Sequence, residues 1–348
     1  MRESIGEVFL LGFRGSRVPD WLRDFAARFG LGGVILFDYD VKARAYDRNV
    51  HSLEQVRALC ADLAALPSRP LVFVDQEGGK VRRLKERLGF APLPSAQDFA
   101  ALDEAERLRL ARASFRELAA LGIHYNLAPV VDLNLNPANP DIGAHGRSFS
   151  ADPAIVRDNA RLLDRAAREA GLGLCLKHYP GMGGATTNSH DERTDLSATL
   201  REDQLALFHE LGAELAGEAI LVSHGHVRQW DARHPVSMSA RALGRLRERL
   251  PEVLLISDDL QMQGLQKTLT TAQALSLGLA AGLDLLLIGN NLLDQEPDCA
   301  HLAEGLAAAC RADDALARRL SASRARVEDR KARFVRPPSS TRPDERRE

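Results

Sequence analysis

Val253-Leu254-Leu255-Ile256 and Leu285-Leu286-Leu287-Ile288 are near-continuous apolar runs, which are typical of parallel strands covered by helices on both faces. Similar short runs alternate with longer helical patterns along the whole chain. Strands are predicted at residues 5–13, 33–37, 71–75, 125–132, 172–178, 220–223, 253–258 and 283–289. Helices are predicted near residues 19–29, 53–65, 103–121, 153–170, 202–217, 240–249, 271–281 and 298–329. This alternation favours a single closed (β/α)8 barrel of the TIM type over an open, doubly wound sheet.

The composition is that of an ordinary soluble globular protein. The 348 residues are 45% hydrophobic and carry a formal net charge of −2, so no basic excess favours a nucleic-acid partner. The most apolar stretch, residues 272–289, is interrupted by polar residues, and no membrane span is expected. We predict one domain over residues 1–333. The polar, proline-broken residues 334–348 are predicted to be a disordered tail.

The sequence favours a cytoplasmic protein. Its first residues lack the charged, apolar and cleavage regions of a secretory signal. Four cysteines without CxxC spacing, Cys60, Cys175, Cys299 and Cys310, are typical of reduced thiols in a cytosolic protein. We expect a monomer or a weak dimer.

Polar residues stand at the carboxyl ends of the predicted strands, where barrel enzymes build their active sites. In chain order they are Asp75, Arg83, Asp132, Arg147, Lys177, His178, His224, His226, Asp258 and Asp259. Packing does not readily explain so many such groups at equivalent positions. Because successive strand residues point to opposite faces, only one of Asp258 and Asp259 is expected to face the mouth. The other is expected to cap the following helix or to pair with a base.

This set of residues matches the needs of glycoside hydrolysis by double displacement. Asp258 is placed to attack the anomeric carbon and form a covalent glycosyl-enzyme. A second group must protonate the leaving oxygen and later deprotonate water. No Asp or Glu precedes Asp191 in the long segment after the fifth strand, whereas His190 lies there. A histidine titrates near neutral pH and can serve as this acid and base.

Several motifs make the chain resemble the β-N-acetylhexosaminidases of glycoside hydrolase family 3, in the short, single-barrel bacterial type. In chain order they are Gly32-Gly-Val-Ile-Leu-Phe37, Val74-Asp-Gln-Glu-Gly-Gly-Lys-Val-Arg-Arg83, Asn126-Leu-Ala-Pro-Val-Val-Asp132, Gly146-Arg-Ser-Phe149, Lys177-His-Tyr-Pro-Gly181, Ser189-His190, Pro235-Val-Ser-Met-Ser239, Ser257-Asp-Asp-Leu260 and Ala281-Gly-Leu-Asp-Leu-Leu-Leu-Ile-Gly-Asn290. Any one motif is moderately specific, but the ordered set is very specific.

The resemblance implies that Asp258 is the nucleophile and His190 the acid/base. It also implies a sugar site made of Asp75, Arg83, Arg147, Lys177 and His178. The implied substrate is a terminal β-linked N-acetylglucosamine, in bacteria usually from the recycling of cell-wall muropeptides. The resemblance implies no metal or organic cofactor.

The chain departs from the family at Asn188. The family pattern before the histidine is Asp-Ser-His, whereas this chain has Asn188-Ser189-His190. In serine-protease triads, replacing the orienting Asp by Asn lowers kcat by about 10⁴. We therefore count Asn188 with the catalytic residues. We expect His190 to be a weaker base than in the family unless Asp191, Glu192 or Asp195 replaces the missing carboxylate.

The pair His224-Gly-His226 is a second departure. Its spacing puts both rings on one face of a strand, which fits a metal-dependent hydrolase with His224, His226, His178 and Asp258 as ligands. Barrels of that class normally carry the pair on the first strand and the aspartate on the last, and this order is absent. We therefore prefer one sugar-contacting histidine, His226, and one structural histidine.

Two other functions remain open. A histidine acid/base does not repel phosphate as a carboxylate does, so a glycoside phosphorylase of the same family is one alternative. A non-catalytic sugar-binding relative is the other, for which Asn188 is the only argument in the sequence. Asp258 and His190 argue against the second alternative, because a pure binder needs no nucleophile.

Overall fold

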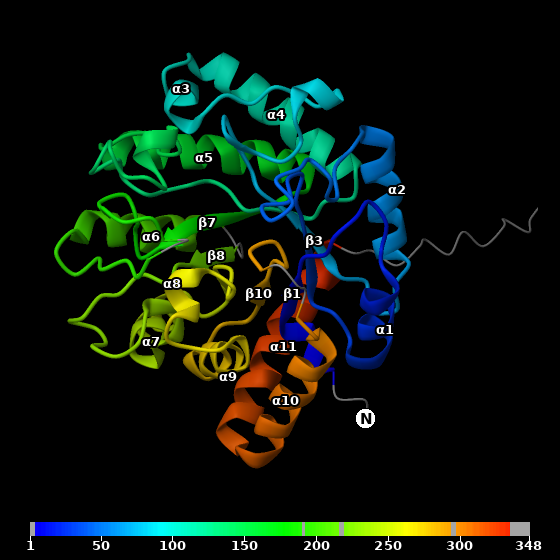
Figure 1. Ribbon diagram of the computed structural model, residues 1–348. Coiled ribbons are helices and arrows are strands. Elements are labelled where there is room, and N and C mark those ends of the chain that lie inside the picture. Colours follow the sequence, from blue (N-terminus) through cyan, green and yellow to red (C-terminus); the bar gives the residue numbers. More distant parts are fainter. Residues whose placement is uncertain (1–3, 190–191, 216–218, 294–296, 335–348) are drawn as a thin grey trace, which may run out of the picture.

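Eight parallel strands form a barrel at the centre of the computed structural model, which describes residues 4–189, 192–215, 219–293 and 297–334 (Figure 1). Around the barrel they are β1 (Phe9–Leu11), β2 (Gly33–Leu36), β3 (Leu71–Val74), β6 (Tyr125–Asn126), β7 (Gly173–Tyr179), β8 (Ala219–Val222), β9 (Leu254–Ser257) and β10 (Leu286–Ile288). β10 pairs with β1. A bridge between Ile256 and Leu285, together with a 2.9 Å hydrogen bond from Ser257 N to Leu285 O, joins β9 to the residue before β10. The predicted closed (β/α)8 barrel is confirmed.

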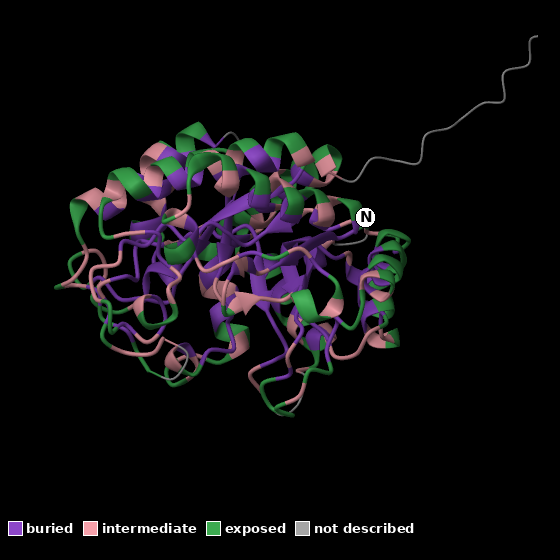
Figure 2. Ribbon diagram, turned by 90° about the horizontal axis from the view of Figure 1, so that it is seen from above, coloured by how far each residue is buried: buried purple, intermediate pink, exposed green. Residues whose placement is uncertain are grey.

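Helices surround the barrel, with exposed outer surfaces over buried strands (Figure 2). They are α1 (Asp20–Phe29), α2 (Leu53–Ala64), α3 (Ala96–Ala100), α4 (Glu104–Ala120), α5 (Pro153–Ala170), α6 (Glu202–Glu214), α7 (Ala240–Arg249), α8 (Gln263–Gln266), α9 (Thr271–Ala281), α10 (Cys299–Ala312) and α11 (Asp314–Phe334). The starts of several follow from the sequence: the Ser52, Asp103 and Asp152 side chains accept backbone N–H groups at the first turns of α2, α4 and α5.

Alternation along each strand divides the core into two apolar clusters. On β1, Leu10 belongs to the smaller cluster inside the barrel, while Phe9 and Leu11 belong to the larger cluster beneath the helices. Phe73 and Tyr125 stack inside the barrel with their ring centroids 5.0 Å apart. The barrel interior is therefore packed with side chains below the strand ends, which leaves the carboxyl-end mouth to hold a ligand.

Some predicted boundaries were wrong. The strand predicted at 125–132 ends at Asn126, since Pro129 has no N–H for the ladder, and beyond it only Val130 forms a bridge, to Lys177. The helix predicted at 298–329 is two helices, because Asp313 is extended and its side chain accepts the N–H of Ala315 at the start of α11. The first predicted strand opens instead with a 3-10 turn, Ile5–Val8.

A hairpin follows β3 that the sequence analysis did not predict. Its strands are β4 (Gln76–Gly78) and β5 (Val81–Arg82). Three further 3-10 turns lie at Glu86–Leu88, Gly143–His145 and Val236–Met238. The four cysteines are buried, and they form no disulfide with one another. No helix among the described residues is long and apolar enough to span a membrane. Except for Phe334, which ends α11, the predicted tail lies outside the described residues.

Candidate active site

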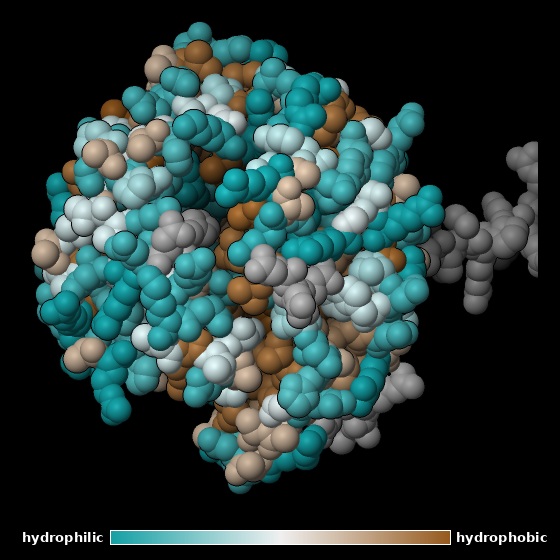
Figure 3. Space-filling model, in the orientation of Figure 1, coloured by the Kyte–Doolittle hydropathy of each residue, from teal (hydrophilic) through white to brown (hydrophobic). Residues whose placement is uncertain are grey.

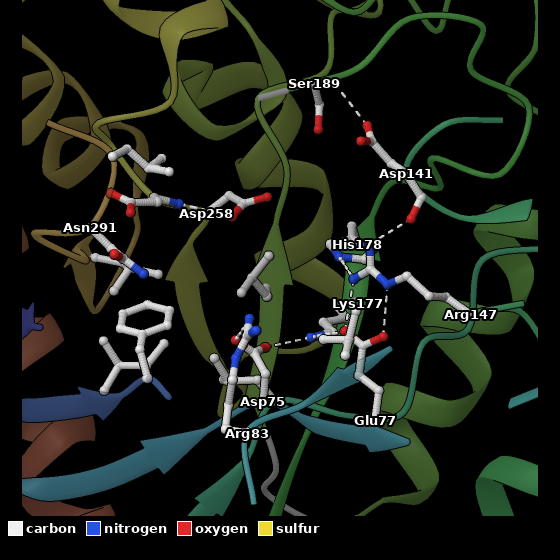
Figure 4. Close-up of a pocket in the computed structure, with 18 of the residues that line it drawn as sticks. Asp75, Glu77, Arg83, Asp141, Arg147, Lys177, His178, Ser189, Asp258 and Asn291 are labelled. Carbon is white, nitrogen blue, oxygen red and sulfur yellow. Dashed lines mark hydrogen bonds and ion pairs between the residues drawn. The ribbon is translucent and has the colours of Figure 1, made fainter. Parts of the chain in front are cut away.

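A pocket of about 220 Å³ opens at the carboxyl ends of the strands. Hydrophobic residues lie near the centre of this face, among mostly hydrophilic neighbours (Figure 3). The lining includes five predicted substrate-binding residues, Asp75, Arg83, Arg147, Lys177 and His178, as well as Asp258. In Figure 4, Asp258 lies on one side of the pocket, and Lys177, His178 and Arg147 lie on the opposite side.

Lys177 is the centre of a buried cluster of charges. Its Nζ lies 2.7 Å from Asp75 Oδ1 and 2.5 Å from Glu77 Oε1. Arg147 donates two hydrogen bonds of 2.7 and 2.8 Å to Glu77, the fork geometry that suits a planar guanidinium. The Lys177 side chain is 3% exposed and that of Glu77 is 4% exposed. Two cations and two carboxylates thus neutralise one another in the wall of the pocket.

Burial and ion pairing act in opposite directions on these groups. Burial alone would raise the pKa values of Asp75 and Glu77, but the neighbouring cations lower both, that of Glu77 to about 2. Burial alone would lower the pKa of Lys177, yet Asp75 and Glu77 raise it. The cluster is therefore fully charged at neutral pH, and its hydrogen-bonding groups are fixed in place before a ligand binds.

Arg83 extends this wall toward the second strand. Its Nη2 lies 3.1 Å from Asp75 Oδ2, and its guanidinium lies over the ring of Phe37 with a distance of 5.5 Å to the centroid. Asp75 thereby holds Lys177 with one oxygen and Arg83 with the other. This orients a fork of N–H donors toward the pocket, an arrangement suited to neighbouring hydroxyls of a sugar.

His178 is oriented by a buried carboxylate. Its Nδ1 lies 2.7 Å from Asp132 Oδ2, and its Nε2 lies 3.1 Å from Nη2 of Arg147. Because Arg147 is always a donor, Nε2 must accept and Nδ1 must carry the proton, which assigns a neutral ring. The register with β8 shifts between Leu176 and Tyr179. At this irregularity the consecutive residues Lys177 and His178 both line the pocket, whereas a regular strand would point them to opposite faces.

Asp258 and Asp259 differ in their surroundings. Asp258 Oδ1 accepts the N–H of Asp259 at 2.9 Å. Asp259 is buried, and its Oδ1 accepts the backbone N–H groups of Gln261 and Gly289. Of the two predicted roles, it does not cap the following helix, since the residue before α8 is Met262, and among the described residues it forms no ion pair with a base. Burial raises the pKa of Asp259 to about 7.

The structure does not bring His224 or His226 to the residues lining this pocket. His224 Nδ1 lies 2.7 Å from the Ser237 hydroxyl, and its Nε2 lies 3.1 Å from Asp259 O. His226 Nδ1 lies 3.0 Å from Arg193 Nη2, and burial together with Arg193 lowers its pKa to about 4. Within the described ranges, no three His, Cys, Asp or Glu side chains gather as a metal site. The geometry therefore lends no support to a sugar contact from His226.

The predicted acid/base, His190, and its neighbour Asp191 lie outside the described residues. The preceding residue, Ser189, lines the pocket, and its N–H donates to Asp141 Oδ2 at 2.8 Å (Figure 4). Asp141 is buried and lines the pocket too. Of the carboxylates expected to replace that of the family, Asp195 lies 2.7 Å from Arg228 and Glu192 is exposed.

Sequence reasoning missed Glu77 and Asp141 as site residues and left Asp132 without a role. The spacing of Asp75 and Glu77 was a usable signal, since residues two apart on an extended segment point to one side. Asp132 was recognised as a strand end, but its partner His178 lies 46 positions away. Nothing in the sequence pairs Asp141 with Ser189, because only the folded loops bring them together.

A charged pocket at the carboxyl ends of a closed (β/α)8 barrel is the arrangement of a barrel enzyme. Residues 2–330 match the family described as glycosyl hydrolase family 3 N terminal domain. A curated β-hexosaminidase of Thioalkalivibrio sulfidiphilus is 34% identical over 320 residues, which cover 85% of this chain and 86% of that protein. A β-hexosaminidase of Pseudomonas aeruginosa is 32% identical over 273 residues, covering 76% and 77%.

Solved structures agree with the sequence relatives. The β-N-acetylhexosaminidase from Beutenbergia cavernae has a TM-score of 0.84 at 25% identity, covering 95% of this chain and 98% of that one. A glycoside hydrolase family 3 β-N-acetylglucosaminidase from Paenibacillus has a TM-score of 0.84 at 26% identity, covering 96% and 62%. The chain belongs to glycosyl hydrolase family 3.

Proposed function

We propose that this protein is a retaining exo-glycosidase that releases terminal β-linked N-acetylglucosamine. The observation that carries the proposal is the position of Asp258 across the pocket from the fixed cluster of Lys177, Arg147 and His178. The relatives named β-hexosaminidase and the structural neighbours named β-N-acetylglucosaminidase support the same substrate class.

In the first step, an oxygen of Asp258 attacks the anomeric carbon while the bond to the leaving oxygen breaks. The backbone N–H of Asp259 positions this nucleophile, because it donates a hydrogen bond to one oxygen of the Asp258 carboxylate. The acid/base His190 gives its proton to the leaving oxygen. In the second step it takes a proton from water, the water oxygen attacks the anomeric carbon, and the bond to Asp258 breaks.

The opposite wall binds the sugar ring. Arg83, Arg147 and Lys177 offer N–H donors, Asp75 offers acceptor oxygens, and His178 lies beside them in the lining, so the hydroxyl groups of one terminal sugar can be bound from several directions. Because these groups are already paired with each other, they bind without first being ordered, which favours affinity.

The carboxylate proposed to support the acid/base stands at a different position of the chain from the family's aspartate. Asn188 carries no charge, but Asp141 contacts the next residue, Ser189. Asp141 therefore brings a carboxylate to the residue that precedes the acid/base, where Asn188 brings none, and we propose that its charge favours the protonated form of the histidine. We assign it as a positioning residue for this loop.

The proposed substrate source is cell-wall muropeptide in the cytoplasm. We propose that the protein acts there as a monomer or a weak dimer. The polar pocket fits a small carbohydrate, and no part of the proposal requires a metal, an organic cofactor, nucleic acid or a membrane.

Assays with a chromogenic N-acetyl-β-glucosaminide and a chromogenic β-glucoside, with and without phosphate, test the function. We expect turnover of the first substrate, and free sugar as the product in both buffers. Asp258→Asn should lower kcat by at least about 10³, as loss of a nucleophile does. Sugar 1-phosphate as the main product would replace this proposal with a phosphorylase, and binding without turnover would replace it with a sugar-binding protein.

A further inference from the structure

His224 does not line the pocket, yet its ring contacts the turn that carries Asp258. Its Nε2 lies 3.1 Å from Asp259 O, and its Nδ1 lies 2.7 Å from the Ser237 hydroxyl. Because a carbonyl oxygen only accepts, Nε2 carries a proton and donates it to Asp259 O. The side chains of His224 and Ser237 are both buried. The ring is therefore held at both of its nitrogens.

The peptide group that joins Asp259 to Leu260 is held from two neighbouring strands. Its oxygen accepts from His224, which follows β8, and its N–H donates to Leu287 O of β10 at 2.9 Å. The same oxygen also accepts the N–H of Met262 at 3.0 Å, a bond within the turn itself. His224 is thus the contact that ties this oxygen to the end of β8.

The preceding peptide group, between Asp258 and Asp259, carries the N–H that donates to Asp258 Oδ1 at 2.9 Å. The two peptide groups are rigid planes joined at the Cα of Asp259, so φ and ψ of this one residue set the angle between them. When His224 fixes the second plane, it limits the direction in which the first plane points its N–H. The position of the ring is thereby transmitted to the carboxylate of Asp258.

His226 contacts a different part of the molecule. Its N–H donates to Thr194 O and its carbonyl accepts the N–H of Leu196, both at 2.8 Å, while its ring contacts Arg193. The two histidines of the His-Gly-His pair are therefore separated in their contacts, and His224 is the one that reaches the turn after β9.

We propose that His224 is a positioning residue for the nucleophile, which it directs through the carbonyl of Asp259. The inference rests on the proposed function, in which Asp258 attacks the anomeric carbon. A displacement of the attacking atom by about 1 Å can lower a rate by about 10²-fold, so one hydrogen bond outside the pocket is sufficient to matter.

Two amide variants of His224 separate its two contacts. Glutamine places its amide nitrogen four bonds from Cα, as far as Nε2 of histidine, so His224→Gln keeps a donor for Asp259 O. Asparagine is one bond shorter, so His224→Asn reaches the Ser237 hydroxyl but not Asp259 O. The same two changes at His301, which is exposed on α10, are the matched controls.

The attack by Asp258 is measured as the rate of covalent labelling by a saturating fluorinated N-acetylglucosaminide. We expect His224→Asn to lower this rate, and kcat on the chromogenic substrate, by about tenfold to hundredfold. His224→Gln should stay within about threefold of the wild type, and Ser237→Ala, which releases the ring at Nδ1, should lose about fivefold. The His301 variants should behave as the wild type.

The binding of N-acetylglucosamine, measured by calorimetry, distinguishes positioning from a general loss of structure. The Kd should be the same in His224→Asn and in the wild type, because Lys177 and Arg147 lie on the opposite side of the pocket (Figure 4). Urea unfolding of the two amide variants provides a second check, and we expect them to be equally stable.

Equal labelling rates in His224→Asn, His224→Gln and the wild type would overturn the positioning role while the proposed function stands. An equal loss in both amide variants would overturn the assignment of Asp259 O as the contact that matters. A weaker Kd and a lower unfolding free energy in step with the rate would show a structural role instead. If the wild type is neither labelled nor active, the proposed function fails and the positioning role fails with it.

Discussion

The predicted sugar-binding wall of the pocket and the loop that leads to the predicted acid/base are held in very different ways. Asp75, Glu77, Lys177 and Arg147 are locked together by several ion pairs, and each contacts at least one partner within 3 Å. The segment that leads to the predicted acid/base has no charged side chain from Gly181 to Ser189 and contacts the pocket wall through hydrogen bonds, among them that from Ser189 N to Asp141 Oδ2. Groups that bind the sugar ring can stay fixed through the reaction, whereas an acid/base must serve both a leaving group and water. We infer that this protein divides the two tasks between strand ends and a loop.

Removing Lys177 should break the fixed wall and give the largest effect. Lys177→Met leaves Asp75 and Glu77 as buried carboxylates with one cation fewer, which should cost about 3–5 kcal/mol in the free energy of unfolding. Urea unfolding measures it, with the exposed Lys80→Met as the control. The double variant Lys177→Met/Glu77→Gln should cost less than the sum of the single changes. Strict additivity would contradict a coupled cluster.

Asp259 shows what burial does to a carboxyl group that lacks such an ion-pair network. Burial raises its pKa to about 7, while cations lower the pKa values of Asp75 and Glu77 in the wall of the same pocket. A raised pKa in the folded state stabilises the protein below the unfolded value near 4, and this stability is lost as the pH rises toward 7.

Asp259→Asn keeps the acceptor for Gln261 and Gly289 but removes the ionisation. Relative to this variant, the wild type should lose stability on the order of 4 kcal/mol between pH 4 and pH 7. Urea unfolding across this range measures the difference, and the exposed Asp62→Asn controls for the change of charge. Parallel pH curves for Asp259→Asn and the wild type would show that Asp259 is not protonated in the folded state.

On the loop side, Asp141→Asn should leave the unfolding free energy nearly unchanged, because the amide oxygen still accepts from Ser189. It should lower kcat by about tenfold, the value of one charge-assisted interaction, and shift the basic limb of the pH–rate profile to lower pH. A drop in kcat without any shift in the profile would indicate a purely structural role.

The smallest effect is expected from Asn188→Asp. If Asp141 already supplies a carboxylate, this change should raise kcat by less than about tenfold, far below the 10⁴ seen when a triad loses its aspartate. In the Asp141→Asn background the same change should give a larger gain, because the two carboxylates would substitute for each other. Unchanged rates and profiles in both backgrounds would rule out any deficit at Asn188.

The barrel and several charged residues of the pocket could be predicted, because both follow from local patterns. Apolar runs mark the strands, and Asp75, Lys177, His178 and Asp258 stand directly at or after their ends. The hairpin β4–β5 and the break at Asp313 could not be predicted, since each depends on short-range hydrogen bonds rather than on hydrophobic periodicity. The contact of Asp141 with Ser189 and the position of His226 outside the pocket lining depend on how separate loops pack, which no single stretch of the sequence encodes.

If Asp258 is the nucleophile, the covalent glycosyl-enzyme can be trapped and the sugar located on this residue. The protein is incubated with a fluorinated N-acetylglucosaminide that forms the glycosyl-enzyme faster than water removes it, then digested and examined by mass spectrometry. We expect one sugar on the peptide that contains Asp258, and no label on the Asp258→Asn variant. A sugar attached to any other residue, or turnover of the chromogenic substrate by Asp258→Asn at the wild-type rate, would contradict it.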